Sequence, residues 1–90
     1  MARYFMHLRD GTEELLDPDG IEFANLSALR NAVLFTARDV LIGDLRDGVL
    51  DLRFRIDAED ETGRIVYTLP FKHALNIIPE GATAPIVQGA

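Results

Sequence analysis

The sequence predicts an α+β domain in which one long amphipathic helix packs on one face of a small antiparallel sheet. Two observations lead to this fold class. Residues 26–46 repeat apolar side chains at helical spacing, and residues 50–58 alternate between apolar and charged side chains without a break. Strand-like segments stand before and after the helix, so the predicted order is β-β-α-β-β with a short C-terminal helical turn.

The first strand is predicted over residues 3–9, where Tyr and Phe suit a pleated surface. A turn at Asp10-Gly11 leads into a short strand at 13–16, and the Asp-Pro-Asp-Gly turn at 17–20 precedes a brief strand at 21–23. The period of two divides the first strand into two faces, with Tyr4, Met6 and Leu8 on one and Phe5, His7 and Arg9 on the other.

The helix begins after an N-cap, for which Asn25 is the first candidate and Ser27 the competitor. It ends before Gly48, which suits the left-handed position that follows a helix. Gly43 inside the helix costs about 1 kcal/mol relative to alanine. At about 100° per residue, the core-facing side is predicted to hold Leu26, Leu29, Val33, Thr36, Ala37, Val40 and Leu41.

The second half of the sheet is a predicted hairpin of strands 50–58 and 64–69, with one buried and one solvated face. Pro70 ends the second strand because it lacks the N–H that a ladder needs. Residues 71–78 are spaced for a short helical turn that packs on the core. We expect a single domain over residues 1–78 and a flexible tail over 79–90, which is rich in Pro, Gly and small residues.

Composition limits the classes of function. The chain has 90 residues, no cysteine and a net charge of −6, so disulfides and cysteine-bound zinc are excluded. The negative charge argues against nucleic-acid partners, which require clustered Lys and Arg. A chain this short has a small hydrophobic core. Small domains often need a disulfide, a metal or another subunit for stability, and association with another subunit is the one that remains here.

Membrane attachment is not expected. No apolar run approaches the ~20 residues that cross a bilayer. The opening residues 1–7 lack the long apolar stretch and the cleavage site of a signal peptide. Both observations favour a cytoplasmic protein.

Four segments together resemble a known family. They are the opening run Arg3-Tyr4-Phe5-Met6-His7-Leu8-Arg9-Asp10-Gly11, the turn Asp17-Pro18-Asp19-Gly20, the helix start Leu26-Ser27-Ala28-Leu29-Arg30 and the late Leu69-Pro70-Phe71. The chain resembles the bacterial domain-of-unknown-function family 6894 over roughly residues 3–78. Met6 stands where a second Phe is common, and Leu29 and Asn31 replace alanines usual in the helix. The resemblance implies a compact domain and brings no activity, cofactor or catalytic residue.

No motif points to catalysis, and we expect no enzyme, no metal site and no cofactor. The acidic residues 57–61 are interpreted as a solvated hairpin tip. Arg53 and Arg55 share a strand face with Asp51 and Asp57, so ion pairing within that face is predicted. Neither His7 nor His73 has an orienting acid in its surrounding sequence, as a general base would need.

A second apolar stripe on the helix carries the main functional hypothesis. Phe35 and Ile42 are predicted to lie in line on the side of the helix away from the core. Leu34 and Leu45, which lie near Arg38, extend the apolar surface of the helix around its circumference. Two explanations stay open. Either the C-terminal segment covers the stripe through Leu75, Ile77 or Ile78, or the stripe is an interface with a second copy.

The sequence therefore favours a non-catalytic interaction module, a homodimer that pairs through Phe35, Ile42, Leu34 and Arg38. The alternative is a small-ligand or regulatory sensor domain that uses the strand face of Phe5, His7 and Arg9. That face combines an aromatic ring with basic groups, which suits an anion.

Overall fold

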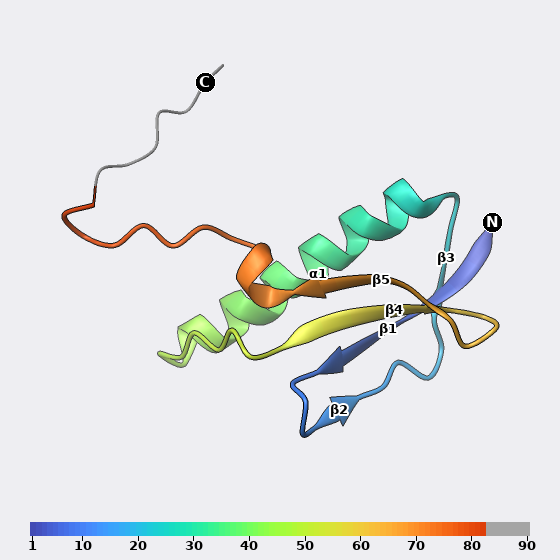
Figure 1. Cartoon of the computed structure of the whole chain (residues 1–90), viewed down its shortest axis with the longest axis horizontal. Helices are drawn as coiled ribbons and strands as arrows, with labels where there is room; N and C mark the ends of the chain where they lie inside the picture. Colours follow the sequence, from blue (N-terminus) through green and yellow to red (C-terminus); the bar gives the residue numbers. More distant parts are fainter. Residues whose placement is uncertain (83–90) are drawn as a thin grey trace, which may run out of the picture.

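The computed structural model describes residues 1–82; the predicted tail extends to residue 90, so its last part lies outside the described residues. One helix and five strands form an α+β fold (Figure 1), which confirms the predicted class and the approximate order of its elements. The elements are β1 (Ala2–Arg9), β2 (Glu14–Leu15), β3 (Ile21–Phe23), α1 (Leu26–Arg46), β4 (Arg55–Asp60), β5 (Ile65–Pro70) and the 3₁₀ helix η1 (Phe71–His73).

All strand pairs are antiparallel, in the order β2-β1-β4-β5 (Figure 1). Strand β3 also pairs with β1, at the end opposite to β2. The two short strands thus share one edge of β1, and residues 16–20 connect them along that edge. In the β1–β4 ladder, His7 lies opposite Asp57 and Arg9 opposite Arg55.

The helix lies along one face of the sheet, and the core fills the space between them (Figure 1). One i, i+4 row of the helix supplies its buried side, and β4, β5 and η1 supply the rest. The buried apolar residues are Leu29, Val33, Ala37, Leu41, Ile56, Ala58, Leu69, Phe71 and Ala74. Leu26, which was predicted on this side, is exposed, because it lies in the first turn of the helix, before the buried row begins.

The helix begins and ends as its sequence indicates. The side chain of Asn25 accepts a hydrogen bond from the N–H of Ala28 at 2.8 Å, so Asn25 is the N-cap and Ser27 is not. After Arg46, Gly48 takes a positive φ of 81°, and its N–H donates to the carbonyl of Leu45. A single uninterrupted helix therefore presents one side to the sheet and the opposite side to the outside.

The strand predicted at 50–58 is displaced to Arg55–Asp60. The cause is its partner strand β1, which ends at Arg9 opposite Arg55 and turns away at Asp10, so residues before Arg55 have no partner on that side. On the other side, within residues 1–82, only the carbonyl of Phe54 is bonded, by the N–H of Phe71 at 2.9 Å. Leu52 and Phe54 still pack against the core without joining the ladder.

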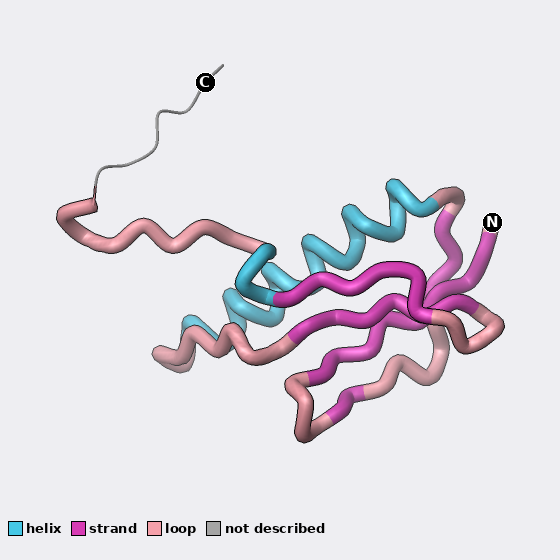
Figure 2. The backbone as a smooth tube through the Cα atoms, in the orientation of Figure 1, coloured by secondary structure: helices cyan, strands magenta, loops and turns pink. Residues whose placement is uncertain are grey.

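The helical turn predicted at 71–78 shortens to Phe71–His73. The β-branched Ile77 and Ile78 lower helix propensity, and Pro79 disfavours helical backbone at the residue before it. The chain therefore leaves the domain in an extended form after Leu75 (Figure 2).

Candidate functional site

The outward side of α1 exposes an apolar stripe. Phe35 is 61 % exposed and Ile42 is 50 % exposed, although both are large apolar side chains. They lie two turns apart on the side of the helix opposite the buried row of Val33, Ala37 and Leu41. The helical spacing therefore places both residues where the sequence predicts them, directed away from the core.

The flank of the helix nearest β5 differs from the stripe. Leu45, which lies there, is 60 % exposed, whereas Leu34 is half-buried and packs against the core cluster. The Nε of Arg38 donates a hydrogen bond to the carbonyl of Ala74 at 2.8 Å. Arg38 thus ties the helix to the C-terminal segment of its own chain.

The described part of the C-terminal segment leaves the stripe open. Leu75 is half-buried and packs on the core, but Ile77 and Ile78 are exposed, and the segment runs away from the domain (Figure 1). Residues up to Ala82 therefore do not cover Phe35 and Ile42.

The sheet face opposite the helix gathers charged side chains from three strands. Phe5, His7 and Arg9 share this face, as their alternation predicts. The ladder sets them against Glu59, Asp57 and Arg55 of β4, respectively. Both His7 and Asp57 are buried on this face, so it is not solvated throughout, contrary to the sequence-based expectation.

Asp57 is the centre of this polar face and is only 5 % exposed. It accepts hydrogen bonds from Arg9 Nη1 at 2.8 Å, Thr68 Oγ1 at 2.9 Å and Arg55 Nε at 3.2 Å. Burial opposes its ionisation, but these donors outweigh burial, so the pKa of Asp57 lies below its ordinary value. The predicted pairing of Arg55 with Asp57 is confirmed, as is that of Arg53 with Asp51.

His7 is buried and uses both ring nitrogens. Its Nδ1 accepts a hydrogen bond from the backbone N–H of Asp17 at 3.1 Å, which requires an unprotonated Nδ1. Its Nε2 then carries the proton and lies 3.2 Å from Glu59 Oε2. The ring therefore joins the edge turn to β4, a role for which its neighbours in sequence give no signal.

The turn at 17–20 folds against the edge of β1. Asp17 Oδ2 accepts the N–H of Met6, and Oδ1 accepts the N–H groups of Asp19 and Gly20. Burial opposes ionisation here too, but the three backbone donors prevail and lower the pKa of Asp17. Asp17 was interpreted from sequence as an ordinary turn residue; its additional bond to β1 is a tertiary contact.

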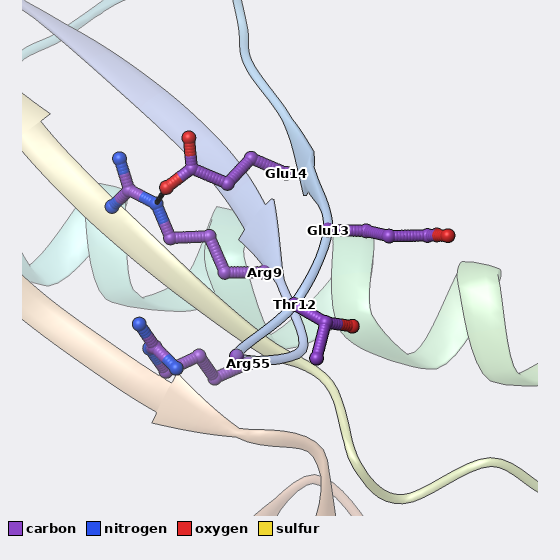
Figure 3. A pocket seen from close by; sticks show the side chains of 6 residues that line it. Arg9, Thr12, Glu13, Glu14 and Arg55 are labelled. Carbon is purple, nitrogen blue, oxygen red and sulfur yellow. Dashed lines mark hydrogen bonds and ion pairs between the residues drawn. The ribbon is translucent and has the colours of Figure 1, made fainter.

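A polar cleft of about 460 Å³ adjoins this face, between the 10–14 turn and Arg55 (Figure 3). Arg9 reaches across it to Glu14, with Nε 2.9 Å from Oε1, while Glu13 points away. The hydrogen bonds that Arg9 donates to the carboxylates of Asp57 and Glu14 raise the pKa of Arg9 despite the opposing effect of burial, so its charge is permanent.

A second cleft, of about 360 Å³, opens on the helix side of the sheet. The sequence gives no sign of it, because its walls come from the helix and from the short strand at Leu15, which are far apart in the chain. Its lining is almost wholly apolar and consists of Met6, Leu8, Leu15, Leu16, Asp17, Thr36, Val40 and Ile56.

Among residues 1–82, no helix is both long enough and apolar enough to cross a membrane. Within the same residues, no three His, Asp or Glu side chains are arranged as a metal-binding group.

The acidic hairpin tip is organised by Asp60, whose Oδ1 accepts hydrogen bonds from the hydroxyl and N–H of Thr62 and from the N–H of Arg64. Its carboxylate thus shapes the turn.

These features define a small α+β domain with an open apolar helix face. A family model described as "Domain of unknown function (DUF6894)" matches residues 3–72, and the chain belongs to that family. The match covers every described helix and strand except the final residue of the 3₁₀ helix and one residue of β1. Comparison with curated proteins and with solved structures gave no match.

Proposed function

We propose that this protein is a non-catalytic interaction module that associates with a second copy of itself through the outward face of α1. The observation that carries the proposal is the exposure of Phe35 and Ile42 on one continuous helix face. Large aromatic and aliphatic side chains gathered on a rigid surface are typical of interfaces rather than of monomer surfaces.

A second copy fits this stripe by symmetry. Phe35 and Ile42 are seven residues apart, about 10.5 Å along the helix. If two helices pack antiparallel about a two-fold axis midway between these residues, each Phe35 meets the Ile42 of the other copy. Such an arrangement is closed, and two-fold homodimers are the most common assemblies of soluble proteins.

A small core makes the partner energetically useful. The domain buries nine apolar residues within its described part, and its largest fully buried side chain is Phe71. Covering the stripe would add buried apolar area to a chain that has no disulfide. Dimerisation would therefore raise the stability of the folded state by mass action.

The test is the mass of the protein in solution, measured by light scattering at tens of micromolar. The dimer mass is expected for the wild type and the monomer mass for Phe35→Glu, with an unchanged circular dichroism spectrum because Phe35 lies outside the core. Leu26→Glu is the matched control, since Leu26 is on the same helix and is also exposed, but it lies off the stripe. A monomeric wild type would remove the proposal.

A second candidate is a small-ligand domain that uses the face of Phe5, His7 and Arg9. The observation in its favour is the polar cleft that borders Arg9 and Arg55. Both guanidinium groups already have carboxylate partners, and His7 is buried, so an anion would have to compete with Asp57 and Glu14. A thermal-shift screen of phosphate and small carboxylates, repeated on Arg55→Gln, tests it; the absence of an Arg55-dependent shift would dismiss it.

A further inference from the structure

The apolar cleft between α1 and the segment at Leu15 is separate from both surfaces considered above. Its volume of about 360 Å³ falls within the range of about 300–1,000 Å³ that is typical of small-molecule pockets. The helix residues that line it, Thr36 and Val40, lie on the flank of α1 that faces β1, whereas the stripe of Phe35 and Ile42 faces away from the sheet. A ligand in this cleft would leave the stripe free, so the site is independent of the proposed dimer.

The cleft exists because the core lies to one side of the sheet. The buried apolar side chains of the strands come from β4 and β5, at Ile56, Ala58 and Leu69. Met6 and Leu8 of β1 lie opposite Ala58 and Ile56 and so face the helix, but both are only half-buried. The β1 side of the sheet thus forms a floor that the helix does not fully cover.

The outer wall of the cleft is formed by β2 and the residue after it. Leu15 is 69 % exposed and Leu16 is 52 % exposed, although both border other apolar side chains in the cleft. Leu15 lies opposite Leu8 in the β1–β2 ladder, so strand pairing fixes the position of this wall. Apolar side chains that are exposed around a concave surface favour a ligand that would cover them.

The two polar residues of the cleft lie toward the same end. Both α1 and β1 begin at the same end of the molecule and run in the same direction (Figure 1). Thr36, one turn before Val40, therefore lies at the end nearer Met6, whose N–H donates to Asp17. The opposite end is apolar and holds Leu8 and Val40.

Asp17 gives the polar end a negative charge. Burial raises its pKa, but hydrogen bonds from three backbone N–H groups outweigh burial and lower it, so the carboxylate is ionised at neutral pH. Within residues 1–82, Oδ1 accepts two of these bonds and Oδ2 accepts only the N–H of Met6. A carboxylate can accept about four hydrogen bonds, so Oδ2 can accept one more.

We infer that this cleft binds a small hydrophobic amine, whose apolar body lies along Leu8, Leu15 and Val40 and whose ammonium group pairs with Asp17. The hydroxyl of Thr36 supplies a second acceptor at the same end. A charge-assisted hydrogen bond to the carboxylate fixes the orientation of the amine. A fatty acid with the same apolar body is rejected, because its carboxylate would meet that of Asp17.

An NMR titration of the isotope-labelled full-length protein tests the head group. Its three probes are n-octylamine, n-octanol and octanoate, which share one chain and differ only in the polar group. Octylamine, which is protonated at neutral pH, should bind at least about tenfold more tightly than octanoate, with octanol between them. The backbone signals expected to shift are those of Leu15, Asp17, Thr36 and Val40.

Three results of this titration would overturn the inference. Octanoate binding as tightly as octylamine would show that the charge of Asp17 plays no part. Octanol binding as tightly as octylamine would show that the cleft recognises only the apolar body. Shifts confined to residues outside the cleft, or the absence of any shift, would show that the cleft is not the site.

A matched pair of variants separates binding in the cleft from a general attraction of cations to an acidic protein. Val40→Phe places a larger side chain in the cleft and should abolish octylamine binding. Ile65→Phe makes a similar change at an exposed position outside the cleft and should bind octylamine as the wild type does. Both variants keep the net charge of −6. Unchanged octylamine binding in Val40→Phe would contradict the inference.

Asp17→Asn tests the proposed ion pair directly. The amide removes the charge, so octylamine and octanol should bind with about equal affinity, and a retained preference for octylamine would overturn the pairing. Thr36→Val covers the case in which Asp17→Asn does not fold, because it preserves the turn at residues 17–20 and the shape of the helix surface. It removes one acceptor and should weaken octylamine binding severalfold; an unchanged affinity would also contradict the proposed site.

Discussion

His7 connects three parts of the fold through one imidazole ring. Its Nδ1 holds the backbone of Asp17, its Nε2 faces Glu59, and its Cα belongs to β1. Because Nδ1 accepts a hydrogen bond, it carries no proton, so the ring is neutral and its proton is on Nε2. Its structural role therefore depends on hydrogen-bond geometry more than on charge.

Replacing His7 by alanine is expected to destabilise the domain by about 2–3 kcal/mol. The substitution leaves the partly buried N–H of Asp17 without its acceptor and removes a buried side chain. Thermal unfolding should show a midpoint lower by roughly 10 °C or more for a domain of this size. His73→Ala is the control, since His73 is exposed, and it should unfold as the wild type does. Equal midpoints for the two variants would contradict this role.

The acid sensitivity of the domain is expected to centre on Asp57 and Asp17. Both have pKa values lowered in the folded state. A lowered folded-state pKa means that the unfolded chain binds protons first, so the stabilisation is complete above the unfolded value of about 3.9 and is lost as the pH falls below it. The urea midpoint should therefore decrease between about pH 5 and pH 2.

Asp57→Asn isolates one part of this pH dependence. The amide keeps the shape of the carboxylate but loses its charged pairing with Arg9 and Arg55. The variant should be less stable than the wild type at pH 7, and the difference should narrow as the pH falls below about 3.9, because the unfolded wild-type chain then takes up a proton at Asp57. A constant difference between the two proteins at every pH would show that the charge of Asp57 is not involved.

At the level of single side chains, the sequence predicts local partners and misses distant ones. Arg53 with Asp51 and Arg55 with Asp57 follow from the period of two within one segment. The burial of His7 follows instead from a turn ten residues away that folds against the strand edge. No pattern within the first strand predicts that the turn at residues 17–20 packs against the edge of that strand.

Among the elements, the helix tolerates a glycine that it does not need for its own packing. A Cβ built on Gly43 meets no atom within 4 Å. Gly43→Ala should therefore raise the free energy of unfolding by about 0.5–1 kcal/mol, because alanine loses less backbone entropy on folding. Thermal unfolding measures this, and a lower midpoint would contradict it.

Gly20→Ala provides the opposite comparison. Gly20 has a φ of 71°, and an added Cβ would lie 2.9 Å from both the ring of Phe5 and the carbonyl oxygen of Tyr4. The same chemical change should therefore destabilise the domain. It should also loosen the turn that Asp17 and His7 hold against β1.

The strands show why alternation alone does not fix the limits of an element. Residues 50–58 alternate without a break, yet the ladder includes only those that face a partner strand. Leu52 and Phe54 keep the burial that the pattern predicts while their backbone stays outside the sheet. Burial is encoded locally, whereas pairing depends on where β1 ends.

For the whole molecule, the division of surfaces follows from its layers. The sheet covers one side of the helix, and within residues 1–82 no second layer covers the other, so Phe35 and Ile42 stay exposed there. The sequence predicts this stripe because helical spacing is a local property. The sequence does not decide whether the C-terminal segment covers the stripe, since the position of that segment depends on tertiary contacts at Ala74 and Leu75.

If the folded dimer is the stable species, unfolding must depend on protein concentration. Two unfolded chains form from one folded dimer, so a higher concentration favours the folded side by mass action. The thermal midpoint of the wild type should therefore rise steadily when its concentration is increased from about 1 to 100 μM, whereas that of Phe35→Glu should stay constant. Leu26→Glu should retain the dependence, because its substitution lies off the stripe. A wild-type midpoint that does not change over this range would mean that the domain folds and unfolds as an independent monomer and that the exposed stripe contributes nothing to its stability.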